Sequence, residues 1–163
     1  MKSSFYNLIA TLVIFTIFGN ISPVSAKSSA ILIAQKTIVQ NPAEDLFNSA
    51  LAKSEAGDIQ GAIADYTEAI RLNPNYAKAY NKRGIIHGRN LKDYSAAKAD
   101  FDRAIEINPN YGDAYYNRAR AREFLEDKPG AIADYQKAAE LYQKDGNTND
   151  YQDAIKHLEM LQE

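Results

Sequence analysis

Two histidines, His87 and His157, are the side chains of this sequence best suited to proton transfer or metal binding near neutral pH. No cysteine is present, which excludes disulfides, thiol nucleophiles and thiolate metal sites. Neither histidine belongs to an HExxH motif or to a similar set of metal ligands. We therefore expect a structural role for each histidine and no metal site.

Other patterns that carry chemistry are also missing from the sequence. The chain has neither a GxxxxGK nor a GxGxxG phosphate-binding loop, and its serines form no GxSxG nucleophile motif. Acidic pairs such as Glu123 and Glu126 stand at helical spacing, which is typical of a solvated helix face. The sequence thus predicts no catalytic residue, no cofactor and no enzymatic activity.

The size and charge of the chain restrict its class. It has 163 residues, about the size of one domain with its own hydrophobic core. Its formal net charge is −2 at pH 7, from 19 basic and 21 acidic side chains. Proteins that follow a phosphate backbone normally carry a basic excess, so this balance argues against nucleic acid as a partner.

One stretch of the sequence occurs twice. Residues 65–80, DYTEAIRLNPNYAKAY, return 35 residues later as residues 100–115, DFDRAIEINPNYGDAY, with 9 of 16 positions identical. A single active site needs no such repetition. A stack of similar structural units does, because each unit covers the apolar face of its neighbour.

Helical periodicity divides residues 43–143 into three pairs of helices. Apolar residues recur at three- and four-residue steps, and short turns separate the helices. In the first turn, Gly57 can close one helix and Asp58 can cap the next. The predicted helices are 43–56 with 59–72, 77–90 with 94–107, and 112–125 with 128–143, followed by a last helix at 150–162 that repeats the second-helix pattern.

Small residues recur where the helices of a pair must approach each other closely. These nine positions hold only alanine or glycine: Ala50, Ala62, Ala69, Gly84, Ala97, Ala104, Ala119, Ala131 and Ala138. In this spacing the chain resembles the tetratricopeptide repeat (TPR) family. The resemblance implies an all-α, TPR-type helical solenoid with three helix-turn-helix repeats and a C-terminal capping helix. The predicted repeats are 43–76, 77–111 and 112–145, and the capping helix is 149–163.

The second unit departs from the family pattern between its two helices. It contains one extra residue, and Lys92 stands where the first unit has Gly57. Such a turn needs a residue in the left-handed conformation, which asparagine tolerates better than most residues. The sequence therefore predicts that Asn90 takes this role.

The resemblance implies protein binding without catalysis. In such repeats the first helix of each pair lines a concave groove that holds an extended peptide or a helix. Carried over to this chain, the groove residues are Phe47, Asn48, Leu51, Lys78, Asn81, Lys82, Ile85, Arg89, Tyr116, Asn117 and Arg120. The middle of this groove is basic, with Phe47 and Tyr116 on its two sides, which suits a protein or peptide ligand with an acidic segment and an apolar anchor. The alternative is that these basic side chains are ordinary solvent-exposed residues of a helix face and bind no ligand.

One TPR subfamily grips the C-terminal carboxylate of a chaperone tail with Lys, Asn and Arg side chains on its first helices. In this chain Phe47 and Leu51 stand at the places of the first unit's Lys and Asn. Asp113 and Asn117 stand at the places of the third unit's Lys and Arg. The clamp is incomplete, so the sequence does not favour capture of a carboxylate end.

The N-terminal 26 residues have the layout of a secretory signal peptide. Lys2 precedes an apolar run at 8–18, and a polar stretch ends in Val24-Ser25-Ala26. The run is shorter than the roughly 20 residues that span a bilayer, so a permanent anchor is the weaker alternative. Residues 27–42 are predicted to be a linker or tether. The chain is similar to small exported bacterial repeat proteins, which implies the periplasm, the thylakoid lumen or secretion.

A second candidate function is self-association. The outer face of the first helix pair has no capping repeat, so a second copy of the chain could stack on it to form a homodimer. Phe47, Leu51 and the apolar segment 30–34, AILIA, motivate this hypothesis. The same segment could instead fold back over the face and keep the protein monomeric.

Overall fold

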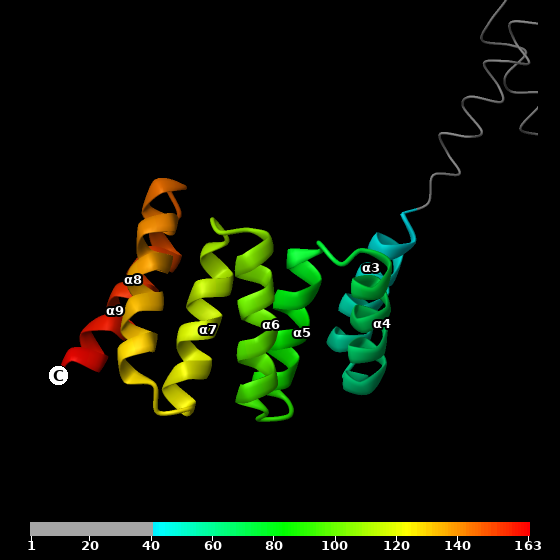
Figure 1. Ribbon diagram of the computed structural model, residues 1–163, viewed down its shortest axis with the longest axis horizontal. Helices are drawn as coiled ribbons and strands as arrows, with labels where there is room; N and C mark the ends of the chain where they lie inside the picture. Colours follow the sequence, from blue (N-terminus) through cyan, green and yellow to red (C-terminus); the bar gives the residue numbers. More distant parts are fainter. Residues whose placement is uncertain (1–40) are drawn as a thin grey trace, which may run out of the picture. The chain divides into compact units, whose positions relative to one another are not determined.

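The computed structural model describes residues 41–163, and this part of the chain consists of seven α-helices joined by short turns (Figure 1). The helices are α3 (Pro42–Glu55), α4 (Ile59–Leu72), α5 (Ala77–Arg89), α6 (Tyr94–Ile107), α7 (Gly112–Phe124), α8 (Lys128–Lys144) and α9 (Thr148–Gln162). Each begins and ends within two residues of a predicted helix. The predicted signal peptide, the apolar segment 30–34 and nearly all of the predicted tether lie outside the described residues. Among the described helices, none is both long and apolar enough to cross a membrane.

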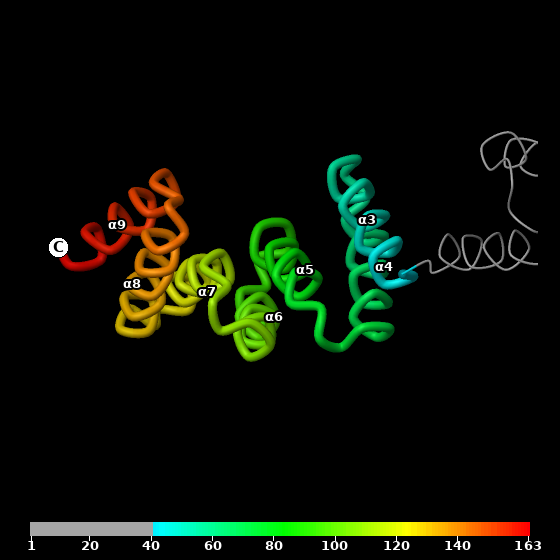
Figure 2. The backbone as a smooth tube through the Cα atoms, turned by 90° about the horizontal axis from the view of Figure 1, so that it is seen from above, coloured from blue at the N-terminus to red at the C-terminus, as the bar shows by residue number. Residues whose placement is uncertain are grey.

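The helices pack as consecutive pairs, α3 with α4, α5 with α6 and α7 with α8 (Figure 2). Each pair also packs against the next pair along the chain. In addition, α5 and α7, the first helices of the second and third pairs, contact each other directly. α9 packs against α8 at the C-terminal end of the array. This arrangement confirms the predicted all-α fold of TPR type.

Aspartates start the second helix of every pair. Asp58, Asp93 and Asp127 each accept a hydrogen bond through a side-chain oxygen from the backbone N–H three residues later, at 3.0, 2.9 and 3.0 Å. An acceptor at this position satisfies one of the N–H groups that the first turn of a helix leaves without a partner. The three second helices therefore begin in the same way.

A residue in the left-handed conformation comes directly before each of these aspartates. Gly57 has φ +85°, as predicted, whereas Lys92 and Glu126 have φ values of 58° and 61°. The prediction for Asn90 is wrong, because Asn90 is right-handed with φ −92° and ψ −41°. The turn requires a left-handed residue directly before the capping aspartate. Lys92 stands at that place and therefore adopts the left-handed conformation despite its side chain.

Replacing Lys92 by glycine should raise the free energy of unfolding by about 1 kcal/mol, because the left-handed conformation is strained for lysine and free of strain for glycine. Chemical denaturation measures the change. Asn90→Gly is the matched control, since Asn90 already has a right-handed backbone and glycine there should give no gain. Equal stabilisation by both variants would contradict this account of the turn.

The small residues lie where the helices meet, as predicted. All eight alanines among the nine positions are 0% exposed, and Gly84 is buried. A Cβ atom at Gly84 would come within 2.7 Å of the Phe101 ring, so this close approach of α5 and α6 requires glycine. Tyr66, Phe101 and Tyr135 fill the space beside these contacts and are at most 3% exposed.

Bidentate ion pairs join the two helices of the second and third pairs. Arg83 on α5 donates to both carboxylate oxygens of Asp100 on α6, at 2.9 and 2.6 Å. Arg118 on α7 makes the same contact with Asp134 on α8, at 2.8 and 2.6 Å. Asp100 and Asp134 are 6% and 3% exposed, so these pairs belong to the interior of the fold.

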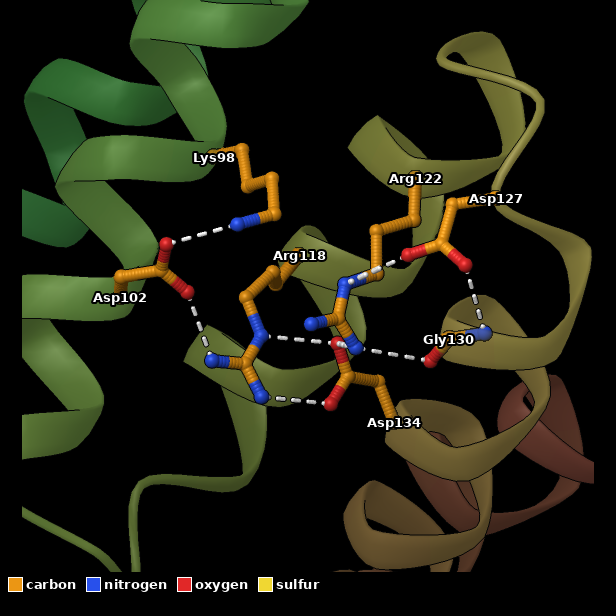
Figure 3. Close-up of polar contacts among 7 residues, drawn as sticks. All are labelled: Lys98, Asp102, Arg118, Arg122, Asp127, Gly130 and Asp134. Atoms are coloured by element: carbon orange, nitrogen blue, oxygen red, sulfur yellow. Dashed lines mark hydrogen bonds and ion pairs between the residues drawn. The ribbon is translucent and has the colours of Figure 1, made fainter.

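The ion pair between Arg118 and Asp134 extends into a network over three helices (Figure 3). Arg118 also donates to Asp102 on α6 at 2.7 Å, and Arg122 donates to Asp134 at 2.9 Å. Burial disfavours the charged forms of Asp102 and Arg118. Their hydrogen bonds to oppositely charged side chains favour the charged forms and have the larger effect. The pKa of Asp102 is therefore lowered and that of Arg118 raised. This network stabilises the contact between the second and third repeats.

Buried tyrosines make the fold sensitive to alkaline pH. Burial, aided by the charge of Glu55, raises the pKa of Tyr66 to about 12. Burial also raises the pKa of Tyr135 and of Tyr142. Because an unfolded tyrosine titrates near pH 10, the stability linked to these groups is complete below about pH 10 and is lost as the pH rises toward 12.

We therefore expect tyrosinate absorbance above pH 10 to rise together with the loss of helical circular dichroism. A pH titration that records both signals on one sample tests this. If all tyrosines ionised near pH 10 while the helices remained folded, the linkage between tyrosine burial and stability would be contradicted.

Candidate functional site

An open hollow of about 420 Å³ lies on the side of the molecule formed by the first helices. Helices α5, α7 and α9 line it, together with Tyr142 of α8. Seven of the predicted groove residues meet there: Asn81, Lys82, Ile85, Arg89, Tyr116, Asn117 and Arg120. The structure thus brings most of the predicted groove of the second and third repeats into one concave site.

The predicted groove residues nearest the N-terminus lie outside the hollow. Phe47 is 9% exposed, and its ring packs against Tyr66 and Tyr76 at centroid distances of 5.6 and 5.0 Å. Phe47 is therefore a core residue, which corrects its assignment as a ligand anchor and removes one motive for stacking of a second copy. Leu51 is half-buried against the same cluster. Asn48 and Lys78 are exposed and do not line the hollow.

The last helix contributes to the site, which the sequence analysis missed. Asp150 and Asp153 of α9 line the hollow. The ring of His157, also on α9, stands at 88° to that of Tyr116 on α7, with centroids 5.7 Å apart. α9 thus occupies the place of the first helix of a fourth pair, which corrects its assignment to the second-helix pattern.

Asparagines hold α5 and α7 together at the floor of the hollow. Asn81 is 2% exposed; its side chain donates to the Tyr111 hydroxyl at 3.2 Å and accepts from Asn117 at 3.1 Å. Both side-chain ends of Asn81 are therefore engaged within the protein. Its role in the site is to position the two helices, and the exposed side chains around it are the ones free to meet a ligand.

The basic and the acidic residues around the hollow lie in different parts of it. Its basic residues are Lys82, Arg89 and Arg120, and its acidic residues are Asp113, Asp150 and Asp153. The acidic residues stand in the first two turns of α7 and α9, where they also complement the helix dipoles. Asp113 is held in place by the Tyr142 hydroxyl, which donates to it at 2.9 Å. The site is therefore basic over α5 and the middle of α7 and acidic near the starts of α7 and α9.

The cations of the hollow differ from the arginines at the helix contacts. Within residues 41–163, Lys82, Arg89 and Arg120 take part in none of the ion pairs. Arginines at the helix contacts are paired instead, as Arg83 is with Asp100 at 2.6 Å and Arg118 with Asp134 at 2.6 Å. Cations that face a hollow without a carboxylate partner can bind anionic groups of a ligand.

Tyr116, which lines the hollow, belongs to a cluster of aromatic rings. Tyr116 is half-buried and packs edge-to-face on Tyr135 at 5.4 Å. His157 stacks on the same Tyr135 ring at 5.1 Å, and the Tyr135 hydroxyl donates to Glu123. Burial raises the pKa of Tyr116, although the charge of Arg120 opposes the shift. Tyr116 therefore packs against its aromatic neighbours and also lines the hollow.

Neither histidine sits in a metal-binding arrangement. In the described part of the chain, no cluster of three or more histidine, aspartate or glutamate side chains could hold a metal ion. His87 lies with its Nε2 atom 3.9 Å from a carboxylate oxygen of Asp100, beside the α5–α6 ion pair. His157 packs against Tyr116 and Tyr135 of the third repeat.

Three family models match overlapping parts of the chain. A model described as TPR repeat matches residues 51–90, and two described as tetratricopeptide repeat match residues 77–111 and 101–156. Together they run from α3 into α9. The chain is a tetratricopeptide repeat protein. The third match includes the start of α9, in agreement with its place as the first helix of a further repeat.

Solved TPR domains have the same fold. The TPR domain of Arabidopsis OM64 is 28% identical, with a TM-score of 0.66, and the match covers 74% of this chain and 98% of that one. The first TPR domain of Spaghetti (RPAP3), in complex with the HSP90 peptide SRMEEVD, is 26% identical, with a TM-score of 0.61 and coverage of 72% and 93%. The TPR2B domain of yeast Sti1, in complex with an Hsp70 peptide, is 23% identical, with a TM-score of 0.70 and coverage of 76% and 98%. A comparison with curated protein sequences gives no match.

Proposed function

We propose that this TPR protein is a non-catalytic adaptor or assembly factor that binds an extended, acidic protein segment in the hollow of α5, α7 and α9. The observation that carries the proposal is the set of three cations, Lys82, Arg89 and Arg120, which line the hollow without a carboxylate partner among residues 41–163. A peptide that supplies carboxylates would pair with them, and TPR grooves suit extended segments.

The complex of the RPAP3 domain supports a peptide as the kind of ligand. The HSP90 peptide in that complex, SRMEEVD, carries three acidic side chains and one arginine. The site in this chain differs from the carboxylate clamp, because Phe47 is buried and Asp113 is an acid where the clamp has a lysine. An internal acidic segment therefore fits this hollow better than a free carboxylate end.

The acidic side of the hollow restricts how charges can be arranged along the ligand. A segment whose carboxylates lie over Lys82 and Arg120 places its next residues over Asp113, Asp150 and Asp153. A basic or hydrogen-bond-donating residue suits that position, whereas further acidic residues are repelled there. The preferred ligand thus has an acidic block followed or preceded by a basic residue.

Short synthetic peptides on an array test this proposal with the full chain. The set contains acidic, basic and neutral peptides and peptides with an acidic block at one end and a basic residue at the other. We expect retention of the peptides with an acidic block, and the strongest retention when the basic residue is present. If no peptide is retained, or if neutral and basic peptides are retained equally well, the proposal is wrong.

We also propose that the protein acts after export, in a periplasm, a thylakoid lumen or outside the cell. The support is the sequence of residues 1–26, with its lysine, its apolar run and its Val24-Ser25-Ala26 ending. Mass spectrometry of the protein isolated from its source tests this, because cleavage leaves a chain that starts at Lys27. A mature protein that retains residues 1–26 would contradict cleavage and favour the anchor.

A further inference from the structure

Two neighbouring turns on one edge of the array carry exposed leucines. The turns α3–α4, α5–α6 and α7–α8 all lie on the same edge, at the bottom of Figure 1. The residue before the left-handed one is Ala56 in the first of these turns, Leu91 in the second and Leu125 in the third. Leu91 is 43% exposed and Leu125 is 39% exposed. The second and third turns therefore present a large apolar side chain where the first turn has only a methyl group.

An aromatic pair joins these two turns. Phe124, the last residue of α7, is 58% exposed, and its ring lies flat against that of Tyr94, the first residue of α6. The ring centroids are 4.2 Å apart, with 5° between the planes. We call Leu91, Tyr94, Phe124 and Leu125 the apolar edge. It holds three of the five large hydrophobic side chains that are exposed within residues 41–163, so exposed apolar surface is concentrated there.

Basic side chains flank the apolar edge. They are Arg89 at the end of α5, which also lines the hollow, Lys92 in the second turn and Lys128 at the start of α8. All three are exposed, and none forms an ion pair within residues 41–163. Long basic side chains can lay their carbon atoms along an apolar surface and keep their charge in water. The edge thus joins apolar side chains to three cations that remain available to a partner.

The acids of the same two turns compensate this positive charge only in part. Asp93 and Asp127 accept hydrogen bonds from backbone N–H groups in the first turns of α6 and α8, at 2.9 and 3.0 Å. There the helix dipole complements their charge. Glu126 is the exposed acid that makes no such contact. The solvent-facing charge of the edge is therefore positive, and this local charge matters most because charges beyond roughly 10 Å are screened at physiological salt.

A lipid surface fits this edge better than a folded protein does. A protein partner needs a surface of matching shape, whereas lipid tails adapt to single side chains that protrude from turns. Leucine and phenylalanine side chains in the headgroup region, beside Lys and Arg that contact anionic headgroups, are typical of proteins that lie on a membrane. The apolar edge combines both features at the outermost parts of the array on that side (Figure 1).

We propose that the apolar edge docks the protein on an anionic lipid surface. The two leucines and Phe124 enter the headgroup region, and the three flanking cations contact its anionic groups. The attachment is peripheral on the part of the chain that the structure describes, where no helix is long and apolar enough to cross a membrane. This inference goes beyond the proposed function and does not depend on it.

Single tryptophans test this orientation, because the chain contains none of its own. Leu91→Trp places a reporter in the apolar edge. Leu72→Trp is the matched control, since Leu72 is 40% exposed and stands at the end of α4, on the other edge of the array (Figure 1). The probes are vesicles of phosphatidylcholine alone and vesicles in which about a third of the lipid is phosphatidylglycerol. Circular dichroism checks that both variants are folded.

With the full chain and the anionic vesicles, we expect the emission of Leu91→Trp to shift to the blue and to be quenched by brominated lipid tails. The emission of Leu72→Trp should stay as it is in buffer. Each reporter senses only its own surroundings, so attachment through the apolar run at 8–18 would not produce this difference.

Lys92→Glu, Lys128→Glu, added to the Leu91→Trp reporter, tests the cations. Glutamate fits at position 92, because Glu126 takes the left-handed conformation at the equivalent place in the next turn. We expect vesicle binding, titrated through the emission shift, to weaken at least about tenfold, since attraction to the anionic surface becomes repulsion. A reporter that carries Lys144→Glu and Lys156→Glu has the same net charge and should bind nearly as the parent does.

Three results would overturn the inference. No shift of Leu91→Trp with anionic vesicles would exclude a lipid surface and leave a protein as the partner of the edge. An equal shift of Leu72→Trp would mean that the apolar edge is not what enters the lipid. Equal binding to both kinds of vesicle would contradict recognition of an anionic surface. No peptide enters these experiments, so each of these results leaves the proposed function standing.

Discussion

Asp134→Ala lowers the free energy of unfolding by about 3 to 5 kcal/mol in our account, because it removes the buried carboxylate that the half-buried Arg118 and Arg122 share. Asp134 is 3% exposed and accepts hydrogen bonds from Arg118 at 2.8 and 2.6 Å and from Arg122 at 2.9 Å. After the substitution, the ion pair with Asp102 on α6 is the one that Arg118 keeps within residues 41–163 (Figure 3). Urea denaturation followed by circular dichroism measures the loss.

Glu140→Ala is the matched control for this variant. It removes an acid from the same helix, but Glu140 is exposed and pairs only with Lys137, at 2.7 Å. An exposed pair of this kind contributes about 0 to 1 kcal/mol, so the control should unfold almost as the wild type does. Comparable losses for Asp134→Ala and Glu140→Ala would show that the network in the interior does not stabilise the array as the structure indicates.

The double variant Lys82→Glu, Arg120→Glu should weaken binding of an acidic peptide by about 100-fold, because it replaces attraction at two positions with repulsion. Both side chains line the hollow, and neither pairs with an acid within residues 41–163. The fold should be retained, since no ion pair is broken. Fluorescence anisotropy with the full chain measures the affinity, and raised salt should weaken the wild type far more than the variant.

Lys144→Glu, Lys156→Glu is the control for this double variant, with the same change in net charge at exposed positions that do not line the hollow. We expect it to bind acidic peptides nearly as tightly as the wild type at physiological salt, where distant surface charges are screened. Equal losses in the two double variants would mean that net charge, and not the hollow, determines binding.

The helices follow from features that the sequence displays directly. Aspartate caps, apolar steps of three and four residues, and alanine or glycine at the nine helix contacts are all local patterns. Asp58 and Gly57 act as their residue types predict. Lys92 does not, because its backbone conformation is imposed by the turn between two packed helices and not by its own preference.

The site was only partly predictable, because it depends on contacts between repeats. Phe47 is covered by Tyr66 of α4 and by Tyr76 in the turn after α4, and the local helix pattern of α3 does not show that these two rings fold back onto it. The role of α9 did leave a signal. Ala154 follows Ala119 by 35 residues, the same distance that separates Ala119 from Gly84, and it is 0% exposed. That spacing marks α9 as a first helix, which faces the hollow.

Site-specific photo-crosslinking in an extract of the source organism tests the central claim most directly. A benzophenone side chain replaces Asp153 in the hollow in one protein and Glu140 on the outer face of α8 in another, so that each loses one exposed acid. We predict a crosslinked partner from position 153, absent when Lys82→Glu and Arg120→Glu are added, and none from position 140. The same partner crosslinked from position 140 and not from position 153 would contradict binding in the hollow.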